Sequence, residues 1–313
     1  MTARALELLE RARTGDAHAI ARTLSMLEND ENGAAELVRA THRDTGKASV
    51  IGVTGPPGGG KSTLVSALVG AYRARGDRVA VVAVDPSSPF SGGAILGDRI
   101  RMRERFLDEG VFIRSMASRG HSGGLARATK RVVDMLDALG YGVVIVETVG
   151  VGQEEVDVMR VADTVCLVTV PGLGDGIQAI KAGVLEVADV IVVNKTDRPG
   201  ADETARDLTL ALSLGPNKPD VWRPPIVRTN AMTEEGVDAL VAAVAKHGAW
   251  ARSSGEAERR STAAARAEIE TLARESLYRR LLTRIGADRL DQAAAAVAHR
   301  QRDPYTAVEE LLS

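Results

Sequence analysis

The segment Val50-Ile51-Gly52-Val53-Thr54-Gly55-Pro56-Pro57-Gly58-Gly59-Gly60-Lys61-Ser62-Thr63 is the most informative part of this chain. Its first five residues predict a buried strand, and the rest completes the pattern G-x-x-x-x-G-K-[ST]. In such a loop, successive backbone N–H groups and the amino end of the following helix face a phosphate. Lys61 adds a positive charge near the β- and γ-phosphates, and the Ser62 hydroxyl can ligate Mg²⁺. The residues predicted to bind nucleotide here are Gly55, Pro56, Pro57, Gly58, Gly59, Gly60, Lys61, Ser62 and Thr63.

Strand-like and helical segments alternate from residue 48 to about residue 248. Several of the strand-like segments are continuous Val/Ile runs, which is typical of strands covered on both faces. This alternation predicts an α/β fold with a doubly wound, mostly parallel sheet. The expected strands are 48–54, 78–84, 111–114, 142–148, 164–170, 189–193 and 225–229.

Helical extensions are expected at both ends of this domain. We predict an N-terminal helical extension over 1–46, in which Asp16 caps a helix, a nucleotide-binding domain over 47–252, and a C-terminal helical arm over 253–313. In the arm an apolar residue recurs every four positions, at Ala265, Ile269, Ala273, Leu277, Leu281 and Ile285. Such a stripe must be covered by the core or by a second chain. Gly286 is expected to end this helix, and Asp288 to cap the next.

Composition limits the compartment and the kinds of partner. Charged residues make up 26% of the 313 residues but the net charge is only −2, so nothing favours nucleic acid or an anionic membrane as a partner. Aromatic residues, at 3%, are too few for base-stacking platforms. The N-terminus lacks a signal-peptide core, and no apolar run is long enough to span a membrane. The single Cys166 is expected to be a core residue, and the chain to be cytoplasmic.

The base of the nucleotide is indicated by Asn194-Lys195-Thr196-Asp197, which follows an expected strand. The Asp197 carboxylate can accept hydrogen bonds from guanine N1–H and from the exocyclic amino group, and adenine offers no such pair of donors. Asn194 can bridge the base and the phosphate loop, and the stem of Lys195 can lie over the ring. The backbone of Asn230 and Ala231, after the last expected strand, is predicted to contact guanine O6. The motif is the N-K-x-D guanine reader of GTPases, so the α/β fold is predicted to be that of a P-loop GTPase.

Acidic residues at strand ends are the candidate partners of Mg²⁺. Glu147 follows a Val/Ile run and begins Glu147-Thr148-Val149-Gly150, where GTPases usually carry D-x-x-G. Asp85 and Asp98 are further candidates for the metal set with Ser62 and Glu147. The N–H of Gly150 is expected to sense the γ-phosphate. Val151 stands where many GTPases have a glutamine that orients water, which predicts slow unassisted hydrolysis.

Taken together, these motifs resemble the MeaB/ArgK-type GTPases that accompany adenosylcobalamin-dependent acyl-CoA mutases. The resemblance covers roughly residues 1–300 and rests on Gly55–Thr63, 85–88, 92–99, 147–153, 171–175 and 194–197. It implies a homodimer formed largely through the C-terminal arm. It also implies a GTP-hydrolysing chaperone that binds GTP or GDP with Mg²⁺ and helps to load and protect methylmalonyl-CoA mutase or a related mutase.

The resemblance also implies catalytic roles for individual residues. Lys61 and Glu147 belong to the nucleotide and metal site. Asp175, Gln178 and Lys181 fall in a switch segment that senses the mutase and supports activated hydrolysis, in which Lys181 could supply the charge of an arginine finger.

The chain itself is not expected to bind cobalamin. The mutase motif for that cofactor is D-x-H-x-x-G after a strand. The nearest string here, Asp16-Ala17-His18-Ala19-Ile20-Ala21, lacks the glycine and is expected to be helical.

Three other functions compete with this interpretation. A nickel-inserting metallochaperone could use a related fold, but one Cys and five scattered His residues provide no metal-holding cluster. A P-loop phosphotransferase would need an acceptor site that the sequence does not reveal. A binding scaffold with an inactive nucleotide site is disfavoured because Lys61, Ser62 and Glu147 are all present.

Overall fold

The computed structural model describes residues 2–85, 107–117, 124–148, 159–172, 187–213 and 221–313. Their strands form one sheet in the order β3-β2-β4-β1-β5-β6-β7, in which every pair is parallel. The strands are β1 (Ser49–Thr54), β2 (Val79–Asp85), β3 (Val111–Ala117), β4 (Val143–Thr148), β5 (Thr164–Thr169), β6 (Val190–Asn194) and β7 (Ile226–Thr229). Each corresponds to one of the strands expected from the sequence, so the predicted α/β class is confirmed.

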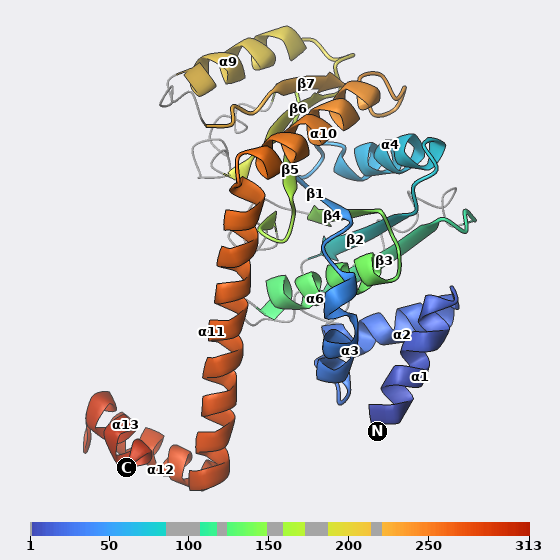
Figure 1. Ribbon diagram of the computed structural model, residues 1–313. Coiled ribbons are helices and arrows are strands. Elements are labelled where there is room, and N and C mark those ends of the chain that lie inside the picture. Colours follow the sequence, from blue (N-terminus) through green and yellow to red (C-terminus); the bar gives the residue numbers. More distant parts are fainter. Residues whose placement is uncertain (1, 86–106, 118–123, 149–158, 173–186, 214–220) are drawn as a thin grey trace. The chain divides into compact units, whose positions relative to one another are not determined.

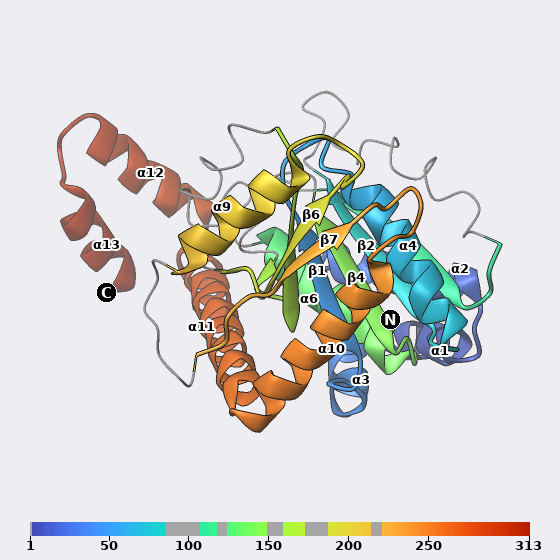
Figure 2. The same ribbon diagram turned by 90° about the horizontal axis from the view of Figure 1, so that it is seen from above.

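Helices cover both faces of the sheet (Figures 1 and 2). The helices α4 (Lys61–Ala74) and α10 (Val237–Ser253) pack on one face. On the other face lie α6 (Gly124–Ala138) and the N-terminal helices α1 (Thr2–Arg13), α2 (Ala17–Glu28) and α3 (Ala34–Thr41), the last followed by the short helix η1 (His42–Asp44). Helix α9 (Ala201–Ser213) packs near β6 and β7. Asp16 caps α2 as predicted, since its carboxylate accepts from the N–H groups of His18 and Ala19.

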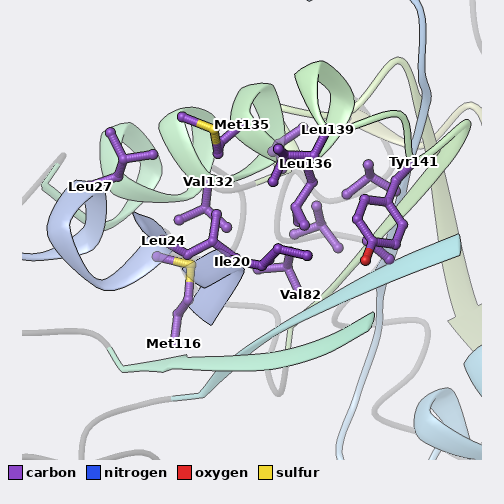
Figure 3. Packing of buried hydrophobic residues seen from close by; sticks show 14 of the residues in the cluster. Ile20, Leu24, Leu27, Val82, Met116, Val132, Met135, Leu136, Leu139 and Tyr141 are labelled. Carbon is purple, nitrogen blue, oxygen red and sulfur yellow. The ribbon is translucent and has the colours of Figure 1, made fainter. Parts of the chain in front are cut away.

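The two faces of the sheet explain the continuous Val/Ile runs. In β4, Val143 and Ile145 point to the layer that contains α4, whereas Val144 and Val146 point to the layer that contains α6. Successive side chains of a strand point to opposite faces of the sheet. Because both faces are buried here, polar residues are found only at the end of the strand. Figure 3 shows the layer that contains α6, where Leu24 of α2 and Leu136 of α6 pack against the sheet.

Cys166 on β5, an interior strand of the sheet, is fully buried. Burial, with a smaller contribution from the Asp189 carboxylate, raises the pKa of its thiol to about 12. The thiol is therefore protonated at neutral pH and behaves as a small apolar side chain, as the sequence predicted.

The chain divides into two compact units, residues 1–257 and 258–313. The second contains most of α11 (Glu256–Ile285), with α12 (Ala287–Ala298) and α13 (Pro304–Leu312). There the Arg284 guanidinium donates to the carbonyls of Leu311 and Leu312, at 3.0 and 2.7 Å, and so caps the end of α13. No helix among the described residues is long and apolar enough to cross a bilayer.

One expectation for this second unit is wrong. Helix α11 does end before Gly286, but Gly286 itself is the cap residue of α12, and Asp288 lies within the first turn of that helix. The positive φ of Gly286 completes the change of direction within one residue, so the next helix begins at Ala287. Asp288 still places a negative charge near the positive end of the helix.

A buried polar cluster joins α10 to the amino ends of β5 and β6. His247 is fully buried, with Nδ1 2.8 Å from Thr164 Oγ1 and Nε2 3.2 Å from the Asp189 carboxylate. Asp189 also accepts the N–H of Val165, and its carbonyl accepts the indole N–H of Trp222. This cluster lies at the edge of the sheet opposite the carboxyl ends of the strands.

We expect His247→Ala to lower the free energy of unfolding by about 3 kcal/mol, because it leaves a cavity and removes a polar partner of the buried Thr164 and Asp189. Urea unfolding followed by tryptophan fluorescence measures this directly. The protein's two tryptophans, Trp222 and Trp250, have ring centres 5.0 and 5.8 Å from that of His247. The exposed His18→Ala is the matched control, with a change within about 0.5 kcal/mol. Equal unfolding midpoints for both variants would rule out a stabilising role for the cluster.

Candidate functional site

The phosphate loop connects the carboxyl end of β1 to the amino end of α4 and depends on its glycines. Gly55 has a φ of +146°, and a Cβ there would lie 2.1 Å from the carbonyl oxygen of Val168. Gly60 has a φ of +82°, and its Cβ would lie 2.5 Å from Asn194 Nδ2. The backbone can therefore follow this path, against β5 and the end of β6, only without side chains at these two positions.

Lys61, the first residue of α4, is held by the loop that it follows. Its Nζ donates to the carbonyl oxygens of Gly55 at 2.8 Å and Pro56 at 3.1 Å, and the residue is only 6% exposed. These bonds fix the ammonium group over the loop. A nucleotide phosphate in the loop would therefore meet a cation whose position is already set.

Ser62 and Glu147 meet at the carboxyl end of β4. The Ser62 hydroxyl donates to Glu147 Oε1 at 2.7 Å, and both residues are buried. Beside them, the hydroxyls of Thr54 and Thr148 are 3.0 Å apart and tie the ends of β1 and β4 together. A hydroxyl and a carboxylate are oxygen donors of the kind that Mg²⁺ takes alongside nucleotide phosphates, so this pair fits the predicted metal site.

Asn194, at the end of β6, connects the predicted base reader to the phosphate loop. Its Nδ2 donates to the carbonyl of Gly59 at 2.9 Å, and its Oδ1 accepts from Thr229 Oγ1 and from the N–H of Ala231, each at 3.1 Å. One buried amide thus holds three loops in register. The bond to Gly59 is the phosphate-loop side of the bridge expected from the sequence.

Lys195 makes a second connection between the same loops. Its φ of +59° is unusual for a residue with a side chain, and its Nζ donates to the carbonyl of Gly58 at 2.7 Å. Asp197 follows two residues later, with its side chain exposed toward a pocket.

That pocket has a volume of about 540 Å³, within the range of small-ligand sites. Twelve of its lining residues were predicted from the sequence: Pro57, Gly58, Gly60, Lys61, Ser62, Thr63, Glu147, Asn194, Lys195, Asp197, Asn230 and Ala231. Arg198 and Met232 also line it and were not singled out. Both directly follow residues of the predicted base site, so adjacency to Asp197 and Ala231 was the signal that could have revealed them.

The structure does not test every predicted residue. Asp85 ends β2, but its side chain is outside what the structure describes. Asp98, Gly150, Asp175, Gln178 and Lys181 lie outside the described residues altogether.

The phosphate loop and the base reader are hydrogen-bonded to each other across one pocket, at the carboxyl edge of a parallel sheet. A single nucleotide can therefore touch both, and this is the architecture of a P-loop GTPase. The family model described as methylmalonyl-CoA mutase-associated GTPase MeaB matches residues 17–285. The chain belongs to this family, as the sequence motifs indicated.

Relatives and a solved structure agree with this assignment. A Pyrococcus abyssi protein named as a candidate GTPase is 46% identical over 98% of this chain and 95% of its own length. GTPase ArgK of Escherichia coli is 38% identical over 75% of this chain and 73% of its own length. The crystal structure of an LAO/AO transport system kinase superposes with a TM-score of 0.71 at 28% identity, covering 99% of this chain and 96% of that one.

Proposed function

We propose that this protein is a GTP-hydrolysing switch that acts as a chaperone of an adenosylcobalamin-dependent acyl-CoA mutase. The observation that carries the proposal is the bond from Asn194 to Gly59, which joins a guanine-reading motif to a phosphate loop in one pocket. Family membership supports the partner, because the family is described by its association with methylmalonyl-CoA mutase.

In this proposal the buried polar groups of the pocket bind the triphosphate and its metal ion. Lys61 neutralises charge at the β- and γ-phosphates. Ser62 and Glu147 hold Mg²⁺ together with Asp85 and Asp98. When bound, the metal ion neutralises charge that develops on the phosphate oxygens. The ammonium group is already fixed by two carbonyls, so little reorganisation is needed when the nucleotide enters.

The guanine ring is recognised at its edge. Asp197 accepts two hydrogen bonds from the ring, and the backbone of Asn230 and Ala231 faces O6. Support comes from the position of these groups around one pocket. An adenine base would leave the Asp197 carboxylate without its donors, which disfavours ATP.

Coupling to the mutase is assigned to the segment that contains Asp175, Gln178 and Lys181, with Gly150 as the sensor of the γ-phosphate. Partner contact would position these residues for hydrolysis, which otherwise stays slow. Cobalamin itself is bound by the mutase rather than by this chain.

The C-terminal arm, residues 253–313, is proposed to join two copies of the chain. Helix α11 has no buried residue, and Ile269 and Leu277 of its apolar stripe are 66% and 64% exposed. On α13, Tyr305 and Val308 are also exposed. A second copy would remove this apolar surface from water.

Hydrolysis assays with a cognate mutase test the function. We expect slow GTP turnover by the protein alone and an increase of about 10-fold or more when an adenosylcobalamin-dependent methylmalonyl-CoA mutase is added. The GTP-loaded and GDP-loaded forms should also differ in their affinity for the mutase by calorimetry. Identical turnover with and without the mutase, and identical affinity in both states, would refute the proposed switch.

Glu147→Gln provides the chemical control for this assay. The amide can still accept the Ser62 hydrogen bond but has lost the charge offered to Mg²⁺, so turnover should fall by roughly 10- to 100-fold. GDP binding without Mg²⁺ should change little. A loss of binding without metal would instead indicate a damaged pocket.

A further inference from the structure

Met232 is distinguished from the other described methionines by its surroundings. Met26, Met116, Met135 and Met159 are at most 8% exposed, whereas Met232 is 82% exposed. A single exposed apolar side chain is ordinary on a protein surface. Met232, however, lines the nucleotide pocket, directly after the residues predicted to face guanine O6.

The backbone of Met232 is held in place although its side chain is exposed. Its N–H donates to Asn230 Oδ1 at 3.1 Å, and the Asn230 N–H donates to the carbonyl of Glu235 at 2.9 Å. The preceding N–H, of Ala231, donates to Asn194 Oδ1. The side chain of Met232 thus begins at a point fixed relative to the base reader and has its rotamers available for a ligand.

Lys195 forms another part of the same pocket wall. Its Nζ reaches Gly58, so its methylene stem runs between the base reader and the phosphate loop. The pocket is therefore lined by two flexible, largely apolar stems, one from the loop after β6 and one from the loop after β7. Flat rings are commonly bound between two such side chains, and the polarisable sulfur of methionine makes favourable contacts with aromatic rings.

We propose that Met232 covers one face of the bound guanine ring, with the stem of Lys195 on the other face. This inference rests on the proposed function and adds a residue that contacts the ring face rather than its edge. Ring-face contact does not distinguish purines by their substituents. Met232 therefore contributes affinity, and Asp197 contributes selectivity.

Calorimetry with GDP and IDP separates these two contributions. IDP lacks the exocyclic amino group but presents the same ring faces. We expect Met232→Ala to weaken binding of GDP and IDP by the same factor, roughly 5- to 20-fold. Met232→Leu, which keeps an apolar side chain of similar size, should retain most of the wild-type affinity. Leu210→Ala, on the exposed surface of α9, is the control and should change neither.

A peroxide footprint tests the contact without a mutation. Hydrogen peroxide oxidises a methionine sulfur to the sulfoxide: the O–O bond breaks, sulfur gives up two electrons and gains one oxygen, and the other oxygen leaves as water. We expect GDP to slow oxidation of Met232 by about 5-fold or more, because the ring covers the sulfur. The protein is oxidised in its folded state and then digested, and mass spectrometry of the peptides measures oxidation at each methionine. The buried Met116 and Met135 provide an internal reference.

The outcomes distinguish this inference from the proposed function. If the wild-type protein does not bind GDP in preference to ADP, the proposed function fails. If it binds GDP but Met232→Ala binds equally well, or if GDP does not protect Met232, only the role of Met232 is overturned. A change in the ratio of GDP to IDP affinity in Met232→Ala would also overturn it, because that result requires an effect on the ring edge.

Discussion

Replacing Lys61 by alanine is expected to abolish tight GTP binding, with a loss of affinity of about 100-fold or more. The ammonium group now satisfies the carbonyls of Gly55 and Pro56 and offers its charge to the pocket. Without it, those two carbonyl dipoles would face the negative phosphates. The amino end of α4 and the loop N–H groups would remain, so residual weak binding is expected.

Calorimetry with GTP and with GDP measures this loss. Lys246→Ala, which removes an exposed lysine of α10, is the matched control and should bind normally. Thermal unfolding of each variant without nucleotide shows whether the fold is intact. Nanomolar GTP affinity in a folded Lys61→Ala protein would contradict the assignment of residues 55–63 to the phosphates.

Asp197→Asn is expected to change the preferred base. Asparagine presents one acceptor and one donor group where the carboxylate presents two acceptors. Guanine N1–H and its amino group then lose a partner, whereas the second carbonyl of xanthine gains one. We expect GTP affinity to fall by about 100-fold or more and xanthosine triphosphate to become the better ligand.

Competition between the two triphosphates, read out by displacement of a fluorescent nucleotide, measures this switch. Asp207→Asn, at an exposed position of α9, is the control because it removes the same charge from a residue that does not line the pocket. An unchanged preference in Asp197→Asn would remove Asp197 from base recognition. Equal weakening of both nucleotides would indicate that the loop itself had shifted.

The fold could be predicted from the sequence because its signals are local. The strands β1, β2, β4 and β6 are short Val/Ile-rich runs, and a strand covered on both faces has little place for polar residues before its end. The Asp16 cap of α2 depends only on atoms within three residues along the chain. The predicted cap of α12 was wrong. Both Gly286 and Asp288 are residue types that occur at helix N-caps, and the path of the backbone decided between them.

For the site, the amino-acid pattern alone predicted the chemistry of each piece: a loop for phosphate, a carboxylate at a strand end and a reader for guanine. Only the folded structure shows how these pieces are positioned relative to one another. The Asn194 bond to Gly59 spans 135 residues, and the Ser62 bond to Glu147 spans 85. Met232 and the buried His247 cluster carry no motif, and their surroundings come from segments that meet only when the sheet is assembled. Residue spacing encodes contacts within a few positions, whereas contacts between distant segments depend on strand order and packing.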